Sequence, residues 1–596
     1  MENPLLELQE YENLQEALKK AKGPVQATGT LDSQKVHLMY WLGKDGGFPW
    51  KLVVTYDDQR AREIYDDFRS FTENVWLYPA KDLLFYSADI HGNLMTRQRI
   101  AVWRHLMEEK EGVVVTTLDG LMDHLLPLVF LKQQAVTVEN GQIMDLDEWK
   151  ERLTALGYER TAQVDGMGQF SIRGGIVDIF PLTEEVPVRI ELWDDEVDSI
   201  RSFDPESQRS VEQLEKITIY PSAETILTKK QLEAGIERLE KEEKEYEAAL
   251  RAKHQIEEAS RIRGIIKELT EGIRQGWKRD GLDAYIRYFC PETVSFLDYF
   301  PAGDTLICLD EPARLKEKGE TVEQEFRESM IHRLEKGYLL PGQTELLYAG
   351  TQVLAKLQSS YTVMLTGLDQ KLPGMKVKEK FSFDVRNVNS YQNSFDMLIS
   401  DLTRWKKEGY RVVLLSASRT RASRLASDLR EYDLRAYCPD GTGEEHKAAP
   451  GEILVTYGNI HRGFEYPLIK YVIITEGDMF GTEKKKKRRK KSNYQGKAIQ
   501  SFSELAVGDY VVHEEHGLGI YKGIEKVERD KVIKDYIKIE YGDGGNLYLP
   551  ATRLESIQKY AGADAKKPKL NKLGGTEWNK TKTRVKGAVQ EIARDL

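Results

Sequence analysis

The alternation of short apolar runs with helical segments over residues 1–120 constrains the fold more than any other feature of the sequence. Apolar runs at 51–56 (KLVVTY) and 112–117 (GVVVTT) have the length of buried strands. Residues 59–71 have helical spacing, and we expect a further helix after the second run, through residue 126. Strands that alternate with helices predict a parallel sheet covered by helices on both faces.

Residues 128–220 change to a pattern of period two. The segments 170–180 (FSIRGGIVDIF), 186–193 (VPVRIELW) and 197–203 alternate apolar and polar residues. Such alternation is typical of a sheet with one face in solvent. We therefore predict a strand-rich domain inserted into the first α/β lobe.

The remaining segments differ in character. Residues 227–280 are charged and carry apolar residues at three-four spacing, which predicts an amphipathic helix. Residues 345–480 again alternate strands and helices, so we expect a second α/β unit there. The run 484–491 (KKKKRRKK) repels itself and predicts a disordered linker. Residues 501–560 are strand-rich, with a hairpin turn predicted at 542–545.

Composition excludes several classes of protein. Lys and Arg number 87 against 97 Asp and Glu, a net charge of −10, which does not suit a general nucleic-acid coat. The three cysteines are far apart, so neither a zinc site nor a disulfide framework is expected. There is no signal-peptide pattern and no membrane-length apolar run in the sequence. We expect a cytoplasmic, monomeric protein without membrane contact.

Residues 29–36 (GTLDSQKV) partly match the phosphate-binding loop G-x-x-x-x-G-K-[ST]. Gly29 and Lys35 have the required spacing. Gln34, however, replaces the second glycine, and its side chain obstructs the approach of the loop to a phosphate. Val36 replaces the Ser or Thr whose hydroxyl binds magnesium. The pattern predicts a nucleotide site that no longer functions.

A second remnant lies at 305–312 (TLICLDEP), where an apolar run ends in Asp310 and Glu311. Motor ATPases place a metal-coordinating and a water-activating carboxylate in this layout. A strand end with exposed acids is the alternative interpretation. Together, the two remnants favour a RecA- or helicase-type lobe that has kept its fold and lost its chemistry, so we expect no catalytic residue.

Several passages resemble known families. Residues 78–106, 168–210 and 295–312 resemble UvrB, the damage-verification protein whose strand-rich insert binds UvrA. Residues 505–562 (LAVGDYVVHEEHGLGIYKG and onward) resemble the polymerase-interacting module of CarD-type regulators. A UvrB-like module followed by a CarD-like module is specific to the bacterial transcription-repair coupling factors.

The resemblance implies a division into seven segments. They are a degenerate RecA-type lobe in two parts (1–127 and 216–340), an inserted α+β UvrA-binding domain (128–215), a second small α/β domain of unknown role (345–480), a basic linker (481–500), a small SH3- or Tudor-like β-barrel (501–562), and a linker with the start of a missing translocase (563–596). ATP and magnesium serve the motor of the complete family. We expect neither cofactor in this chain.

The resemblance also implies the partner contacts. The UvrA-binding residues would be Arg173, with Arg160 and Phe180 as weaker candidates, because arginine pairs with carboxylates and aromatic residues anchor interfaces. Phe180 could instead be a core residue and Arg160 a plain surface charge.

The RNA polymerase β subunit is the partner that the resemblance implies for the C-terminal module. An exposed edge strand and turn would contact it by extending its sheet. The residues expected there are Val511, Val512, His513, Glu514, His516, Gly517 and Gly519. No third ligand accompanies the two histidines, so we expect no metal.

The function that the resemblance implies is transcription-coupled repair. Such a factor recognises RNA polymerase stalled at a DNA lesion and recruits UvrA, and the complete protein releases polymerase by ATP-dependent translocation on double-stranded DNA. Alternatives are an ATP-dependent helicase or UvrB-type protein, which Gln34 and Val36 argue against, and a CarD-type regulator, which the UvrB-like passages argue against.

Overall fold

The computed structural model describes residues 3–20, 23–81, 93–205, 207–275, 281–370, 374–391, 394–439, 448–481, 497–498, 505, 507–513, 516–529, 532–542, 545–550, 557–560 and 570–571. The basic run 484–491, Glu514 and nearly all of 563–596 lie outside the described residues. The described part contains several separate sheets and is a multidomain α/β structure, as predicted. None of its helices is long and apolar enough to cross a membrane.

The first lobe is built on a seven-stranded sheet in the order β15-β1-β14-β13-β2-β4-β3, with every described pairing parallel. Its strands are β1 (Gly23–Thr28), β2 (Trp50–Thr55), β3 (Val75–Tyr78), β4 (Gly112–Thr117), β13 (Thr305–Asp310), β14 (Tyr361–Thr366) and β15 (Lys380–Ser382). Its helices are η1 (Pro4–Glu7), α1 (Gln9–Lys20), α2 (Asp32–Asp45), α3 (Asp58–Phe68), α4 (Asn93–Glu108), α10 (Pro312–Glu335) and α11 (Gly350–Leu357). Strands β1, β4 and β13 are buried throughout, as strands covered on both faces should be.

Two details of the first lobe differ from the sequence-based expectations. Strands β14 and β15 come from the range assigned to the second unit, yet they complete the first sheet. The helix expected through residue 126 is wrong, because only the short helix η3 (Asp119–Leu121) forms there. Beyond it, Asp123 and Leu125 make isolated bridges to Leu347 and Val294, so distant pairing replaces the local helix.

The inserted domain is a six-stranded sheet in the order β11-β10-β9-β8-β7-β6, antiparallel except between β6 and β7. Its strands are β6 (Glu159–Arg160), β7 (Gln169–Arg173), β8 (Ile176–Ile179), β9 (Val188–Trp193), β10 (Glu196–Phe203) and β11 (Ser210–Leu214). A smaller sheet pairs β5 (Val136–Glu139) with β12 (Lys216–Ile219), and the helices are α5 (Leu128–Gln134) and α6 (Leu146–Ala155). Phe170, Val177, Ile190 and Ile200 are buried on the inner face.

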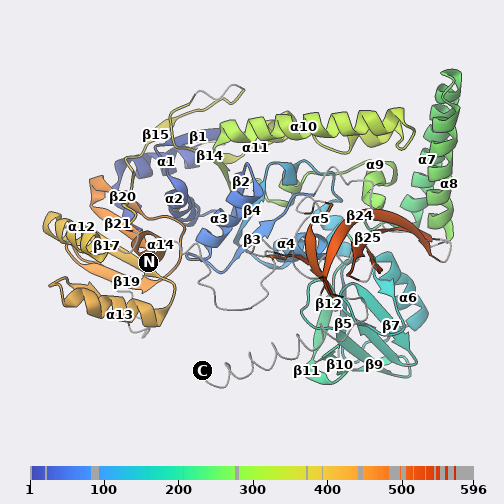
Figure 1. The fold of residues 1–596 in the computed structure, drawn as a ribbon, viewed down its shortest axis with the longest axis horizontal. Coiled ribbons are helices and arrows are strands. Elements are labelled where there is room, and N and C mark those ends of the chain that lie inside the picture. The colour runs from blue at the N-terminus through green and yellow to red at the C-terminus, as the bar shows by residue number, and fades with distance from the viewer. Residues whose placement is uncertain are drawn as a thin grey trace.

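A helical hairpin stands out from the body of the molecule (Figure 1). It consists of α7 (Lys229–Ala252) and α8 (Ile256–Gln275), whose apolar stripes pack against each other. The amphipathic segment predicted at 227–280 therefore folds back on itself. Shorter helices follow it: η4 (Leu282–Tyr285), α9 (Ile286–Phe289), η5 (Phe296–Tyr299) and η6 (Pro341–Glu345).

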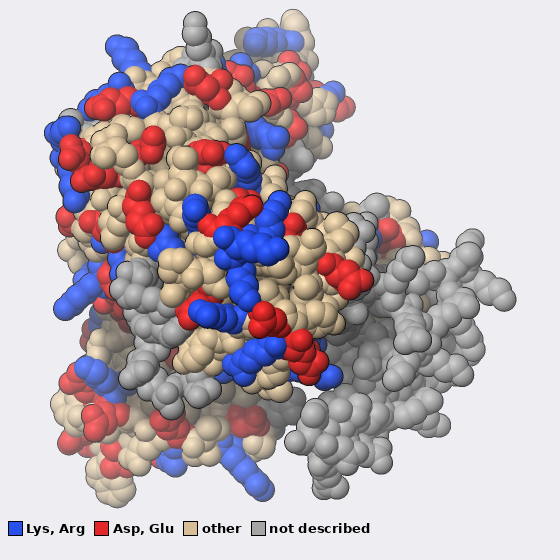
Figure 2. All heavy atoms as spheres, turned by 90° about the vertical axis from the view of Figure 1, so that its left-hand side faces the viewer, with Lys and Arg blue, Asp and Glu red and all other residues tan. Residues whose placement is uncertain are grey.

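The second α/β unit lies at the opposite side of the molecule from this hairpin (Figure 1). Its sheet has the order β16-β20-β21-β17-β19-β18. The elements are β16 (Arg386–Asn387), α12 (Phe395–Glu408), β17 (Arg411–Ser416), α13 (Arg419–Arg430), β18 (Ala436–Tyr437), β19 (Ile453–Tyr457), β20 (Phe464–Tyr466), η7 (Pro467–Ile469), β21 (Tyr471–Thr475) and α14 (Glu476–Phe480). Charges of both signs are interspersed over the face seen in Figure 2.

The first lobe and the second unit share a hydrophobic core. Val36 and Trp41 of the first lobe belong to the same buried cluster as Val413, Phe464 and Ile473 of the second unit. Because this apolar surface is removed from water only when the two units are docked, the hydrophobic effect holds them together.

The C-terminal module has a sheet in the order β22-β27-β23-β24-β25-β26. Its strands are β22 (Lys497–Ala498), β23 (Tyr510–His513), β24 (Gly517–Arg529), β25 (Val532–Glu540), β26 (Asn546–Pro550) and β27 (Ile557–Lys559). The hairpin between β25 and β26 turns at the predicted place.

Candidate functional site

The loop that resembles a phosphate-binding loop joins β1 to α2. Gly29 has a φ of +73°, and a Cβ atom there would lie 2.2 Å from the carbonyl oxygen of Phe383. Only glycine tolerates both the left-handed backbone and this close approach. The glycine is therefore explained by packing against the protein's own backbone.

The amides of this loop already have acceptors within the protein. Thr30 N donates to the Thr366 carbonyl at 3.2 Å, and Leu31 N donates to Gln34 Oε1 at 3.1 Å. A phosphate-binding loop needs such amides free to point at its ligand. The Gln34 side chain, at the position of the second glycine, therefore accepts a loop N–H that would otherwise be free to bind a phosphate.

The predicted lysine and acidic pair do come together. Lys35 Nζ lies 2.7 Å from Asp310 Oδ1 and 2.7 Å from Glu311 Oε1. Thr55 Oγ1 and Arg60 Nε donate to the other Asp310 oxygen at 3.0 and 3.2 Å. Both Lys35 and Asp310 are buried. The groups that would bind a magnesium nucleotide are instead bound to one another.

Asp310 is held as a carboxylate by its neighbours. Burial alone would raise the pKa of its carboxyl group, but the Lys35 and Arg60 cations and the hydrogen bonds from Lys35 and Thr55 lower that pKa below its usual value. The sequence did not single out Thr55 or Arg60. Only their positions, at the end of β2 and in the first turn of α3, could have indicated that they lie near Asp310.

Val36 and Gln34 of the same motif both face the second unit. Val36 is fully buried in the core shared with the second unit and has no hydroxyl to offer a metal. Gln34 Nε2 donates to the Tyr466 hydroxyl at 3.0 Å across the boundary between the two units. The residues at this site therefore do not fit a bound magnesium nucleotide.

A buried polar chain continues from Tyr466 into the first lobe. Trp41 Nε1 donates to His37 Nε2 at 3.1 Å, so His37 carries its proton on Nδ1, which lies 3.1 Å from the Tyr466 hydroxyl. Burial lowers the pKa of His37 to about 3, and the ring is therefore neutral. The chain is a fixed joint between the two units.

Further contacts close the same boundary. Arg411 of β17 forms a two-pronged ion pair with Glu7, with bonds of 2.7 and 2.8 Å. Asp67 Oδ1 accepts the His461 backbone N–H and lies 2.7 Å from its Nδ1. The hydrogen bond from Asp67 raises the pKa of His461, against an opposing effect of burial.

On the inserted domain, the Arg173 side chain is about half exposed and is also held in place by an ion pair. The buried Asp178 accepts Arg173 Nη2 at 2.7 Å and Arg189 Nε at 2.7 Å. Strand pairing puts Arg201 beside Arg189 on the same outer face. Asp178, Arg189 and Arg201 were not identified from the sequence, although they occupy the polar positions of alternating strands.

The other two expected residues differ from Arg173. Arg160 is exposed on the short edge strand β6. Phe180 is buried just after β8, so the core interpretation is correct and its side chain is not part of the exposed face.

In the C-terminal module, the expectation that 511–519 forms an exposed edge is wrong. Strand β23 pairs with β24 on one side and with β27 on the other. Val511, His513, Gly517 and Gly519 are buried, while Val512 and His516 are half-buried. The later segment 557–559 returns to cover the strand, and local sequence gives no sign of that return. In the described residues, the outer strands are β22 and β26.

His513 and His516 stack, with ring centroids 4.9 Å apart. Gly519 is required by close packing, since a Cβ atom there would lie 2.5 Å from the Ile539 side chain. No group of three metal-ligating side chains occurs among the residues that the structure describes.

Comparisons with known protein families match the inserted domain and the C-terminal module. A model of the UvrB interaction domain matches residues 136–224, and one of the CarD-like/TRCF RID domain matches residues 505–561. The chain is therefore a multidomain protein that combines a UvrB interaction domain with a CarD-like domain.

Its curated relatives are transcription-repair-coupling factors. The chain is 34% identical to the one from Bacillus subtilis over 550 residues, and 32% identical to the one from Staphylococcus haemolyticus over 552 residues. Each match covers 91% of this chain and 46% of the relative. The chain is homologous to transcription-repair-coupling factors, as predicted, and it spans about half the length of the curated relatives it matches.

Proposed function

We propose that this chain is an adaptor in transcription-coupled nucleotide excision repair. Its inserted domain would bind UvrA, and its C-terminal module would bind an RNA polymerase stalled at a lesion. The presence of both matched domains in one chain, on separate sheets, carries this proposal. Polymerase release by ATP-driven translocation on double-stranded DNA is no part of the role proposed for these residues.

The first lobe is proposed to be a RecA-type lobe that serves as a scaffold. Its parallel sheet and the positions of Lys35 and Asp310 support that descent. The internal ion pairs and the Gln34–Tyr466 bond support the loss of nucleotide binding. The scaffold would hold the two docking surfaces without turning over ATP.

The proposed UvrA-binding surface is the outer face of the inserted sheet. Cross-strand pairing aligns Ser171, Asp178, Arg189, Arg201 and Gln213 on this face. Arg173 lies next to this row and is about half exposed. Arginines fixed by a buried carboxylate lose little freedom on binding, and their planar donors suit carboxylates of a partner. We place Arg160 at the rim.

The proposed polymerase-binding element is the outer strand β26. An outer strand presents unpaired N–H and C=O groups, and a partner's sheet can be extended by pairing with them. The bond from Tyr541 N to Gly545 O sets the alternation of the β25–β26 ladder, so the N–H groups of Asn546 and Tyr548 point away from β25. Pro550, which has no N–H, falls in the same outward register. We propose the β subunit as the partner.

Two capture experiments test the proposal. The purified chain is immobilised and offered UvrA and RNA polymerase, separately and together, and ATP hydrolysis is measured on the same preparation. Capture of both partners without hydrolysis is expected. Capture of polymerase alone would favour a CarD-type regulator, and hydrolysis would favour a helicase or UvrB-type protein. Failure to capture either partner would exclude the adaptor role.

A further inference from the structure

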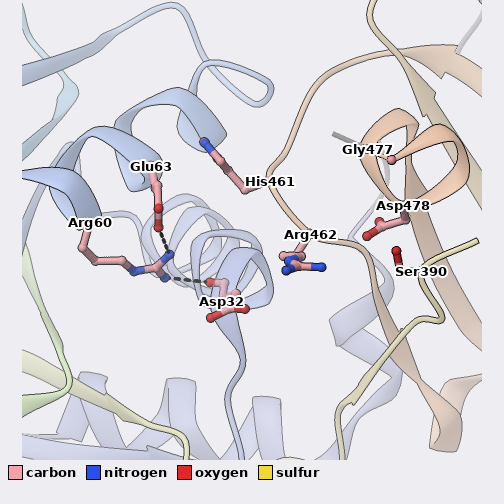
Figure 3. Close-up of a pocket in the computed structure, with 9 residues that line it drawn as sticks. Asp32, Arg60, Glu63, Ser390, His461, Arg462, Gly477 and Asp478 are labelled. Carbon is pink, nitrogen blue, oxygen red and sulfur yellow. Dashed lines mark hydrogen bonds and ion pairs between the residues drawn. The ribbon is translucent and has the colours of Figure 1, made fainter. Parts of the chain in front are cut away.

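A cavity of about 600 Å³ opens at the boundary between the first lobe and the second unit (Figure 3). Asp32 and Arg60 line it from the first lobe, and Ser390, Arg462 and Asp478 line it from the second unit. The cavity lies beside the Lys35 ion network and does not include that lysine. None of the roles proposed above uses it.

Some of the lining groups are already committed to the fold. Arg60 donates to Asp310, to Glu63 and to the Asp32 carbonyl. Asp478 Oδ2 accepts the N–H of Gly463, and it also accepts both the N–H and the hydroxyl of Thr475. These contacts fix the walls of the cavity, and the other Asp478 oxygen has no hydrogen-bond partner among the residues that the structure describes.

Other lining groups are not committed. Arg462 is anchored by its backbone N–H, which donates to Ser33 Oγ at 3.0 Å. Its guanidinium makes no hydrogen bond or ion pair with the described residues, and Figure 3 shows it in the space between Asp32 and Ser390. The Asp32 carboxylate and the Ser390 hydroxyl likewise have no hydrogen-bond partner in the described part of the chain. Free polar groups from both units thus converge on one cavity.

The cavity also lies where α/β proteins bind small molecules. Asp32 follows the carboxyl end of β1, Arg462 follows that of β19, and Asp478 follows that of β21. Ligands of open α/β sheets bind outside the carboxyl ends of the strands. Both sheets therefore direct such ends at the same space.

The charges indicate the class of ligand. A guanidinium pairs well with a phosphate, whose oxygens accept two parallel hydrogen bonds. The carboxylates of Asp32 and Asp478, which lie on either side of Arg462 (Figure 3), would repel a second phosphate, but they accept hydrogen bonds from the hydroxyls of a ribose. A polyanion does not suit this mixture, whereas a molecule with one anionic end and one hydroxyl-rich end does.

We propose that this cavity binds a phosphorylated ribose, with the phosphate on Arg462 and the sugar hydroxyls on Asp32 and the free oxygen of Asp478. The source can be a nucleoside monophosphate or a free ribose phosphate. No metal and no bond cleavage is involved. Because the ligand touches both units, its binding stabilises their docked arrangement by mass action.

Titration calorimetry of the full chain tests the proposal. The ligands are adenosine monophosphate and ribose 5-phosphate, with inorganic phosphate and ribose as separate arms. Saturable one-site binding of at least one phosphorylated ribose is expected, and the arms distinguish the two sources. Arg462→Ala should weaken it roughly tenfold or more, since a lost charged hydrogen bond costs about 1.5–3 kcal/mol. Asp32→Asn should weaken it as well.

The control variant is Arg435→Ala, an exposed arginine of the same unit that does not line the cavity. It should bind like the wild type. Equal binding by Arg462→Ala, no saturable binding, or binding of inorganic phosphate as tight as that of ribose 5-phosphate would each overturn the proposal. An unchanged melting curve of Arg462→Ala shows that the variant is folded, and UvrA capture by the same preparation keeps this result separate from the adaptor role.

Discussion

Gln34 and Tyr466 belong to different α/β units, and the Gln34 amide donates a 3.0 Å hydrogen bond to the Tyr466 hydroxyl inside their shared core. A lobe pair that works as a motor must open and close around its nucleotide. Here Gln34, at the position where a phosphate-binding loop has its second glycine, ties the two units together. Gln34 thus forms a structural joint between the two units.

Tyr466→Phe should loosen this joint. The change removes the acceptor of Gln34 Nε2 and His37 Nδ1 and leaves two buried donors without a partner. Each unsatisfied group costs about 1–3 kcal/mol, so we expect the docked pair to lose roughly 2 kcal/mol or more. Urea unfolding followed by fluorescence measures the loss.

The control for Tyr466→Phe is a double-mutant cycle with Gln34→Leu. Because the two side chains share one bond, the combined effect should be smaller than the sum of the single effects. Additive losses would show that the Gln34–Tyr466 bond does not join the units.

Lys35→Met tests whether the lysine is structural. It removes one cation from the buried Asp310 and the half-buried Glu311, while Arg60 remains on Asp310. We expect a loss of about 3 kcal/mol in the free energy of unfolding, at the lower end for breaking a buried ion pair. Hydrolysis of ATP by the wild type that disappears in Lys35→Met would contradict this account.

Much of the fold could be predicted because the deciding signals are local. The runs 51–56 and 112–117 became strands β2 and β4, and the alternating segments of the insert became β7 to β10. Where pairing partners are distant in sequence, prediction failed. The segment after β4 bridges to residues 294 and 347, and β27 returns to cover β23. No local pattern encodes such pairings.

The candidate site, like the fold, could be predicted from the sequence only in part. The loop and acid motifs correctly brought Lys35 to Asp310 and Glu311, because strand ends of a parallel sheet meet at one edge. The partners that close the site could not be found by motif. Tyr466 lies 432 residues from Gln34 in sequence, and its role depends on how the two units dock.

His461 should make the joint between the units depend on pH. Its pKa is raised by the hydrogen bond to Asp67, so protonation favours the folded state. This stabilisation is fully present below the unfolded pKa, about 6.5, and is lost as pH rises through the raised folded pKa. Its size should stay under about 1 kcal/mol, because the side chain is 42% exposed and solvent screens the pair.

The measurement is the melting temperature of wild type and His461→Gln between pH 6 and pH 8. The difference between them should shrink as the pH rises. His332→Gln, an exposed histidine on α10, serves as the control. A difference that grows with pH, or is constant, would contradict the assigned role of His461.

Arg173→Glu should weaken UvrA capture without unfolding the inserted domain. The side chain is about half exposed, so its loss leaves no cavity, but the reversed charge faces Asp178 and any acidic partner. We expect roughly a tenfold loss of affinity or more, as for other interface arginines. Surface plasmon resonance measures the affinity, and Arg424→Glu on α13 controls for net charge. Undiminished capture by Arg173→Glu would remove this residue from the proposed surface.

Tyr548→Pro should abolish polymerase capture if β26 extends the sheet of its partner. Proline removes the outward N–H of residue 548 and leaves the N–H groups of residues 547 and 549, which face β25, in place. The matched control is Tyr548→Ala, which loses the same side chain, including its bond to Glu525, and keeps the N–H. Capture should survive in the alanine variant and be lost in the proline variant. If both variants lose capture equally, the side chain provides the contact, and if neither does, the polymerase binds elsewhere on the module. A charged residue at Val512, inside the sheet on β23, should instead destabilise the module as a whole, which circular dichroism distinguishes from a lost edge contact.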